Sequence, residues 1–98
     1  MKVSMNERLE ATITGKVQMV MFRDFTQRKA SWLGLVGEVQ NCRDGSVCVI
    51  AEGERKQLEK LLKKIHSGPF LARVDEVQST WLPATNEYKT FSLILGKK

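Results

Sequence analysis

An arginine and an asparagine, Arg23 and Asn41, have the sequence settings that best suggest chemistry. Arg23 follows the stretch GKVQMVMF and stands where a helical pattern begins. The first turn of a helix carries unpaired backbone N–H groups and the positive end of the helix dipole, so a lone cation there is unfavourable. Because a guanidinium matches phosphate oxygens in shape and charge, we interpret this stretch as an anion site. The alternative is an exposed Arg23 that Asp24 partly compensates.

Asn41 is the second candidate, because its position is unusual for an asparagine. It lies three residues before Asp44-Gly45, a strong signal for a hairpin turn, and so falls inside the preceding strand. Asparagine commonly serves turns by hydrogen-bonding to nearby backbone, which is the alternative role here. Within a strand the amide is out of place, which favours a role in a site.

Local patterns predict the elements that would position these two residues. Alternating apolar residues predict a strand that ends at Gly15. Apolar residues then recur at helical spacing from Phe22 to Leu33, and Gly34 suits the end of that helix. Two apolar strands flank Asp44-Gly45 and predict a hairpin in which these two residues form the loop, so that Cys42 faces Val47 and Cys48 faces Asn41.

The second half of the chain completes the pattern of a known architecture. A second helix is indicated by one apolar stripe and ends at Gly68-Pro69; the stripe comprises Leu58, Leu61, Leu62 and Ile65. Strand patterns follow near residues 74–77 and 91–95. The order strand, helix, strand, strand, helix, strand, with a short last strand, predicts an α+β fold. Its form is the ferredoxin-like split βαβ sandwich, an antiparallel sheet with two helices on one face.

Composition limits the class of protein and its partners. The 98 residues, 42% of them hydrophobic, predict a single domain over 1–98 with a core of about 8–95. The net charge of +5 suits anionic partners, with a solvated basic surface as the alternative. Since no signal peptide or membrane span is recognisable, we expect a cytoplasmic monomer that binds no membrane. Cys42 and Cys48 are then expected to be free thiols on opposite faces of the hairpin, unable to bond.

Several chemistries lack the residues they need. The single histidine, His66, stands at a helix end without a cluster of metal ligands, so we predict no metal and no other cofactor. Neither a nucleophile elbow nor a phosphate-binding loop of the Walker type is present. An RNA-recognition module of this fold stacks bases on strand aromatics, and the stretch SVCVIAEG has none. We therefore expect no specific binding of nucleic acid.

Three motifs together resemble the acylphosphatase family. They are GKVQMVMFR, GLVGEVQNCRDGSV and AEG, in this order and over about residues 8–95. The family pattern is glycine, a basic residue, Val-Gln-Gly-Val, any residue and Phe-Arg, followed later by Gly-Leu-x-Gly-x-Val-x-Asn and Asp-Gly-x-Val. The resemblance implies the ferredoxin-like fold that the element order also predicts. One position departs from the pattern, since Met19 replaces a glycine.

The resemblance also implies an activity and residue roles. The family hydrolyses acyl phosphates to a carboxylate and inorganic phosphate without metal. By resemblance, Arg23 would bind the phosphoryl group and Asn41 would orient the attacking water. The backbone N–H groups that would share the phosphoryl group are those of Val17, Gln18, Met19, Val20, Met21 and Phe22. The alternative hypothesis is an anion-binding module of the same fold that has lost turnover through the change at Met19.

The departure from the family pattern at Met19 raises the question of which backbone conformation this residue adopts. Glycine serves either a positive φ or the close approach of a ligand. We favour close approach, which would let Met19 keep an unstrained backbone. Its flexible side chain would then lie along Val17, Val20 and Met21 and cover the mouth of the site. In that case Met19→Gly would slightly lower stability.

Overall fold

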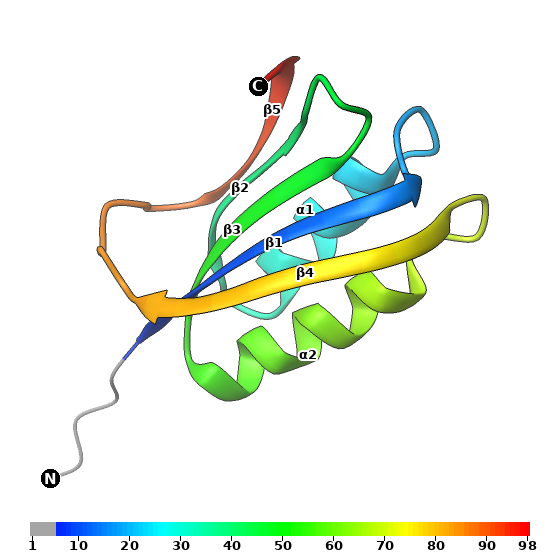
Figure 1. Cartoon of the computed structure of the whole chain (residues 1–98). Helices are drawn as coiled ribbons and strands as arrows, with labels where there is room; N and C mark the ends of the chain where they lie inside the picture. The colour runs from blue at the N-terminus through cyan, green and yellow to red at the C-terminus, as the bar shows by residue number, and fades with distance from the viewer. Residues whose placement is uncertain (1–5) are drawn as a thin grey trace, which may run out of the picture.

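The computed structural model describes residues 6–98, which form a five-stranded sheet covered on one face by two helices (Figure 1). The α+β ferredoxin-like class predicted from the sequence is confirmed. The elements are β1 (Glu7–Lys16), α1 (Phe22–Trp32), β2 (Val36–Asn41), β3 (Val47–Gly53), α2 (Arg55–Ser67), β4 (Arg73–Pro83) and β5 (Phe91–Lys97). Neither helix in this part of the chain is long and apolar enough to cross a membrane.

The strands lie in the order β4-β1-β3-β2-β5. β1 runs antiparallel to β3 and to β4, and β2 runs antiparallel to β3. The edge strand β5, however, is parallel to β2, so the sheet is mixed where the sequence predicted an antiparallel one. The parallel pair arises because residues 84–90 carry the chain from the β4 edge to the β2 edge before β5 begins (Figure 1). The C-terminal end of β5 thereby reaches the end of the sheet where β1 and β2 also finish.

The core lies between the sheet and the helices. Alternate residues of the three central strands point into it, as the period of a strand requires. The apolar stripe predicted for the second helix is also correct: Leu58, Leu61 and Ile65 are fully buried, and Leu62 is partly buried. The remaining buried core residues of the strands and of α1 include Leu9, Ile13, Phe22, Ala30, Val39, Val47 and Val49.

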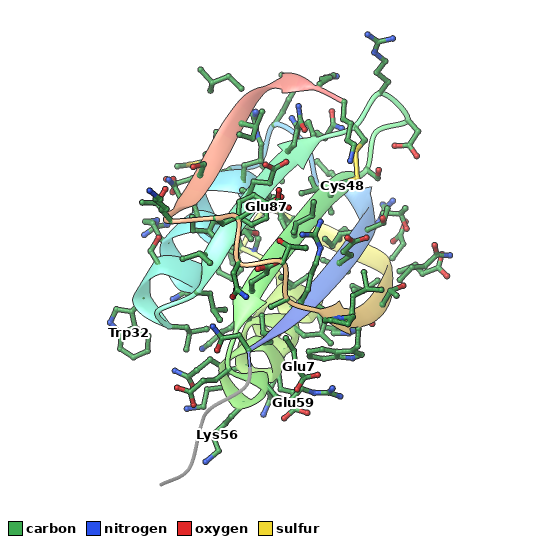
Figure 2. All side chains as sticks on the ribbon, turned by 90° about the vertical axis from the view of Figure 1, so that its left-hand side faces the viewer. Glu7, Trp32, Cys48, Lys56, Glu59 and Glu87 are labelled. Atoms are coloured by element: carbon green, nitrogen blue, oxygen red, sulfur yellow. A yellow bond between two sulfur atoms is a disulfide. The ribbon has the colours of Figure 1, made fainter. Side chains whose placement is uncertain are left out.

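The β2–β3 hairpin differs by one residue of register from the predicted one. Asn41 pairs with Val47, and the N–H of Cys42 donates to the C=O of Ser46 at 2.8 Å, so the loop is one residue longer than expected. A shift of one residue moves a side chain to the other face of a sheet. Cys42 and Cys48 therefore share a face and are joined as a disulfide (Figure 2). The prediction of two free thiols that cannot bond is wrong.

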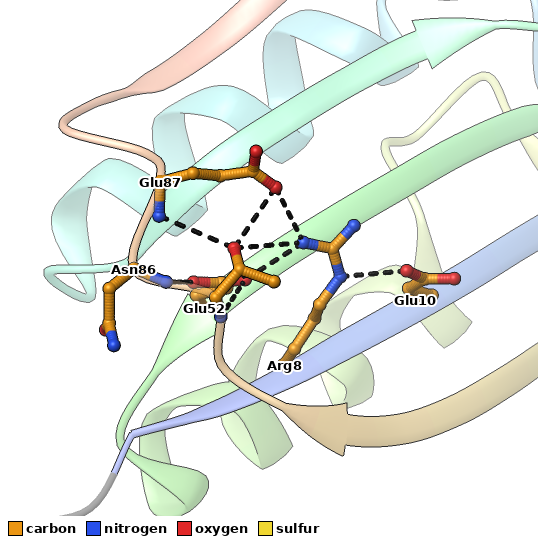
Figure 3. A network of polar contacts seen from close by, with 6 residues as sticks. Arg8, Glu10, Glu52, Asn86 and Glu87 are labelled. Carbon is orange, nitrogen blue, oxygen red and sulfur yellow. Dashed lines mark hydrogen bonds and ion pairs between the residues drawn. The ribbon is translucent and has the colours of Figure 1, made fainter.

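A buried carboxylate binds residues 84–90, the segment that crosses to β5, to the end of the sheet where β3 finishes (Figure 3). Glu52, near the end of β3, is only 2% exposed. Its side chain accepts hydrogen bonds from the backbone N–H groups of Thr85 at 3.0 Å and Asn86 at 2.9 Å. Arg8 of β1 donates to the same carboxylate at 3.0 Å. Glu52 thus holds the segment that returns the chain to β5, a role that its place in the AEG motif does not by itself indicate.

Glu52→Gln is expected to lower the free energy of unfolding by about 2 kcal/mol at neutral pH. A hydrogen bond to a charged acceptor contributes about 1.5–3 kcal/mol. In addition, the side-chain NH₂ of glutamine is itself a donor and would face the backbone N–H groups of Thr85 and Asn86. Urea unfolding measures the difference. The matched control is Glu10→Gln, because Glu10 pairs with the same Arg8 at 2.8 Å but is 41% exposed. This control should cost less than about 1 kcal/mol.

The effect of Glu52→Gln should also depend on pH. Burial alone would raise the pKa of Glu52, but hydrogen bonds from the Thr85 and Asn86 backbone, the Thr85 hydroxyl and Arg8 hold it below its ordinary value. A depressed folded-state pKa adds stability that is present above the ordinary carboxyl pKa and is lost as the pH falls through the folded-state value. The difference between the parent and the variant should therefore shrink in acid. An undiminished difference in acid would contradict this account.

Candidate active site

A cavity of about 370 Å³ lies at the end of the sheet where β1, β2 and β5 finish. Its lining residues come mainly from the loop that joins β1 to α1, the first turn of α1 and the last residue of β2. Arg23 and Asn41, which the sequence analysis singled out separately, both line it. The remaining lining residues are Val17, Met19, Met21, Phe22, Asp24 and Leu93.

The backbone of the loop is shaped to expose its N–H groups. Gly15 has φ of 124°, and a side chain there would collide with the backbone of Arg73 on β4, so only glycine allows the chain to leave the strand at this point. Met19 and Met21 both have left-handed backbones, with φ of 61° and 63°. Left-handed residues next to right-handed ones make successive N–H groups converge into an anion-binding concavity.

These N–H groups have no other partner in the part of the chain that the structure describes. No backbone N–H of residues 17–22 donates to another described residue. The helix begins with Met21 as its N-cap, and no side chain caps it. The open N–H groups and the positive end of the α1 dipole therefore meet at the cavity, which is the setting that binds anions.

The structure places Arg23 so that its charge is available to the cavity. Its Nη1 donates to the backbone C=O of Ile94 at 2.8 Å and of Leu95 at 3.3 Å, both on β5. Asp24, the proposed compensating charge, pairs instead with Arg28 at 2.9 Å. Within residues 6–98 no carboxylate forms an ion pair with Arg23. The strand carbonyls thus orient the guanidinium without neutralising it, and its other N–H groups are free to bind an anion.

Asn41 is the last residue of β2 and lies at the buried floor of the cavity. Its backbone C=O accepts a hydrogen bond from Lys98 at 2.9 Å, and the residue is only 7% exposed. The side-chain Oδ1 is buried and accepts no hydrogen bond from the described residues. A buried polar atom without a partner costs about 1–3 kcal/mol, and the described residues contain a second one, the hydroxyl of Thr26, which does not line the cavity.

Gln18 has a role that the sequence analysis missed. Its amide donates to the backbone C=O groups of Cys42 and Ser46, both at 2.8 Å, and so ties the loop to the turn after Asn41. The carboxylate of Asp44 stiffens that turn by accepting from the hydroxyl of Ser46 at 2.6 Å and from its N–H at 2.9 Å. The bond from the Ser46 hydroxyl makes the larger contribution to lowering the pKa of Asp44, and the bond from the Ser46 N–H lowers it further. The family motif includes Gln18 but does not indicate this role, because the partners of its side chain are backbone carbonyls.

The predicted loop residues differ in what their side chains contact. Val17, Met19, Met21 and Phe22 line the cavity, whereas Gln18 and Val20 do not. The side chains of Val17, Val20 and Phe22 belong to the core and anchor the loop from beneath. Only Met19 and Met21 expose their side chains, at 99% and 70%.

The expectation for Met19 is wrong in both of its parts. The residue has a left-handed backbone, with φ of 61°, so the position requires the conformation that glycine adopts most readily. Its side chain is 99% exposed and does not pack along Val17, Val20 and Met21. The tight reversal from β1 to α1 imposes this backbone, and only solvent is left on the side where the side chain must point.

Met19→Gly is therefore expected to stabilise the fold by about 0.5–1 kcal/mol. A left-handed residue with a β-carbon costs about 1–2 kcal/mol, and the greater freedom of glycine in the unfolded chain offsets about 0.4–1 kcal/mol of the relief. The thermal midpoint and urea unfolding report the change. Met19→Ala keeps the β-carbon and serves as the control, which should not be stabilised. A less stable glycine variant would show that Met19 is not strained.

Comparisons with known proteins agree on one family. The family model described as acylphosphatase matches residues 9–93. An acylphosphatase of Salinibacter ruber is 43% identical over 91 residues, which cover 93% of this chain and 96% of that protein. One from Marinobacter nauticus is 48% identical over 84 residues, or 86% of this chain and 91% of the relative. The crystal structure of acylphosphatase from Bacillus subtilis superposes with a TM-score of 0.87 at 28% identity, covering 91% of this chain and 99% of that one.

Proposed function

The chain belongs to the acylphosphatase family, and from this premise we propose how its own residues hydrolyse an acyl phosphate. The protein is an acyl phosphate hydrolase, whose substrates are small molecules and whose products are a carboxylate and inorganic phosphate. In our proposal Arg23 and the loop N–H groups hold the phosphoryl group, and Asn41 holds the attacking water. The observation that carries it is the convergence on one cavity of an unneutralised guanidinium, open N–H groups and the side chain of Asn41, whose amide oxygen has no donor among the described residues.

The phosphoryl group would be bound by Arg23 and by the N–H groups of residues 17–22. Phosphoryl transfer passes through a loose transition state whose charge is spread over the equatorial oxygens. Donors that already point at those oxygens stabilise this charge without having to reorganise. The bonds from Arg23 to Ile94 and Leu95 support this view, because they hold the guanidinium in place before substrate arrives.

Asn41 would position the water. Its side-chain amide can hold one water molecule by a hydrogen bond, which leaves an oxygen lone pair free to face phosphorus. A loose transition state has little bonding to the nucleophile, so a neutral amide is sufficient and a strong base is unnecessary. Among the described residues, Asp24 is the only one with a carboxylate that lines the cavity, and it is paired with Arg28. We therefore propose that the proton of the water passes to an oxygen of the phosphoryl group itself.

The departing acyl group needs no acid. It leaves as a carboxylate, whose ordinary pKa near 4 makes it stable without protonation at neutral pH. Holding water, phosphorus and leaving oxygen in line then supplies most of what catalysis requires. This accounts for an active site made of an arginine, an asparagine and backbone groups.

The alternative hypothesis, a binding module that lost turnover through Met19, finds no support in the loop. The backbone at Met19 is left-handed, as a glycine would readily be, and its side chain points into solvent. The residue that departs from the family pattern therefore leaves the N–H groups around it unblocked. A binding module would also have no use for a buried amide oxygen that awaits a donor.

Hydrolysis of benzoyl phosphate is expected to persist in excess chelator. In residues 6–98 no group of three or more metal-ligating side chains lies close enough together to hold an ion. Ultraviolet absorbance follows the reaction, and the parent protein should turn over equally well with EDTA and after dialysis. Activity that EDTA abolishes and added magnesium or zinc restores would overturn the mechanism. No turnover of any acyl phosphate would overturn the proposed function.

A further inference from the structure

We propose that Met19 and Met21 form an apolar rim that binds the acyl group of the substrate. The enzyme would then favour acyl phosphates with an alkyl chain of several carbons over acetyl phosphate. This inference rests on the proposed function and specifies its substrate class. It starts from two bulky hydrophobic side chains on the loop that borders the cavity.

Met19 and Met21 occupy positions that are energetically unfavourable for methionine. Both are exposed, at 99% and 70%, so neither side chain gains much stability from packing within the protein. Both have positive φ, a backbone region that side chains with a β-carbon disfavour and that glycine or asparagine adopts more readily. Single exposed hydrophobic residues are normal on protein surfaces. The fold imposes the positive φ, but it does not require methionine, so two methionines on one loop that border the same cavity point to a ligand.

Burial in the cavity indicates where the acyl group must lie. Asn41, at 7% exposure, forms the floor, and Met19 and Met21 form the rim. In-line displacement places the leaving group on the side of phosphorus opposite the water. Since Asn41 would hold the water at the floor, the carboxylate and its acyl chain extend toward the opening, where the two methionines stand.

The chemistry of the rim selects an apolar chain over a charged one. Leu93 extends the apolar wall, and the charged residues that line the cavity are Arg23 and Asp24. Arg23 is assigned to the phosphoryl group, and Asp24 is paired with Arg28 at 2.9 Å. No described lining residue is therefore left to pair with a charged acyl group. Methionine is flexible and polarisable, which suits contact with alkyl chains of varied length.

The test compares acetyl, butanoyl and octanoyl phosphate as substrates. For the parent protein, kcat/KM should rise with chain length, and the ratio of octanoyl to acetyl phosphate should reach about tenfold. Each methylene that is fully buried is worth roughly fourfold in affinity, and a chain on an open rim is only partly buried. In the double variant Met19→Asn with Met21→Asn this ratio should fall to about one, because asparagine keeps the left-handed backbone without the apolar surface.

A control and the contrary outcomes make the test specific. Trp32 is also a large exposed hydrophobic residue, at 85%, but it lies at the other end of α1 and does not line this cavity (Figure 2). Trp32→Gln should leave the ratio unchanged. A parent protein without preference for longer chains, or a double variant that loses activity equally on all three substrates, would overturn the inference and leave the proposed function standing. Failure to hydrolyse any of the three would overturn the proposed function itself.

Discussion

Replacing Arg23 by glutamine is expected to lower kcat/KM for benzoyl phosphate by about 10³-fold or more, the magnitude of losing an arginine that stabilises phosphoryl transfer. The same variant should bind inorganic phosphate more weakly, because the guanidinium contacts the phosphoryl group both before and during the reaction. Glutamine cannot reproduce either the charge or the forked donor geometry of arginine. Steady-state kinetics and phosphate inhibition constants measure both effects.

Arg73 offers a control of the same residue type. It is an exposed arginine on β4 that pairs with Asp75, and neither residue lines the cavity. Arg73→Gln changes the net charge equally but should leave kcat/KM within about twofold, since long-range effects of one surface charge are screened by salt. An Arg23 variant that still bound phosphate as tightly as the parent would contradict the role assigned to its guanidinium.

Replacing Asn41 by alanine is expected to lower kcat by about 10²-fold or more, within the range for removing one positioned polar group, while phosphate inhibition stays nearly intact. The difference from Arg23 follows from the contact: Asn41 is proposed to hold the water and not the phosphoryl group. Stability gives an independent readout. Because Oδ1 has no donor among the described residues, its removal should not destabilise the fold by the cost of a lost hydrogen bond.

Asn41→Asp separates positioning from charge. A carboxylate can hold water as an amide does, but its negative charge should repel the phosphoryl group and weaken phosphate inhibition. Gln40→Ala is the control, since Gln40 lies on the opposite face of β2 and donates to Gly96 instead. Equal weakening of phosphate inhibition in Asn41→Ala and Arg23→Gln would show that the proposed division of roles is wrong.

Local patterns predicted the elements well. The stripe of α2 and the start of α1 near Arg23 follow from periodicity, since one face of each helix must be buried wherever the helix packs. The motifs also pointed to Arg23 and Asn41, which line one cavity in the structure. Their roles stay predictions until the variants are measured.

Two of the wrong predictions concern connections between elements. The sequence predicts Asp44-Gly45 as a two-residue loop, and the extra residue in the actual loop reverses the relative faces of Cys42 and Cys48. Met19 was expected to have an unstrained backbone, because methionine seldom takes a positive φ. In both cases the path of the whole chain, and not the preference of one residue, set the local conformation.

Residue types and their spacing were enough to identify the fold class, the family and the two polar candidates. Each depends on periodicity or on a motif, and these are carried by neighbouring residues. The partners of those candidates emerged only from the tertiary structure: Arg23 is held by carbonyls of β5, and Gln18 by carbonyls of the β2–β3 turn. Every residue has a backbone carbonyl, so the residue types do not show which carbonyl will be the partner. Which carbonyl comes within reach depends on strand order and register, and those are properties of the folded chain.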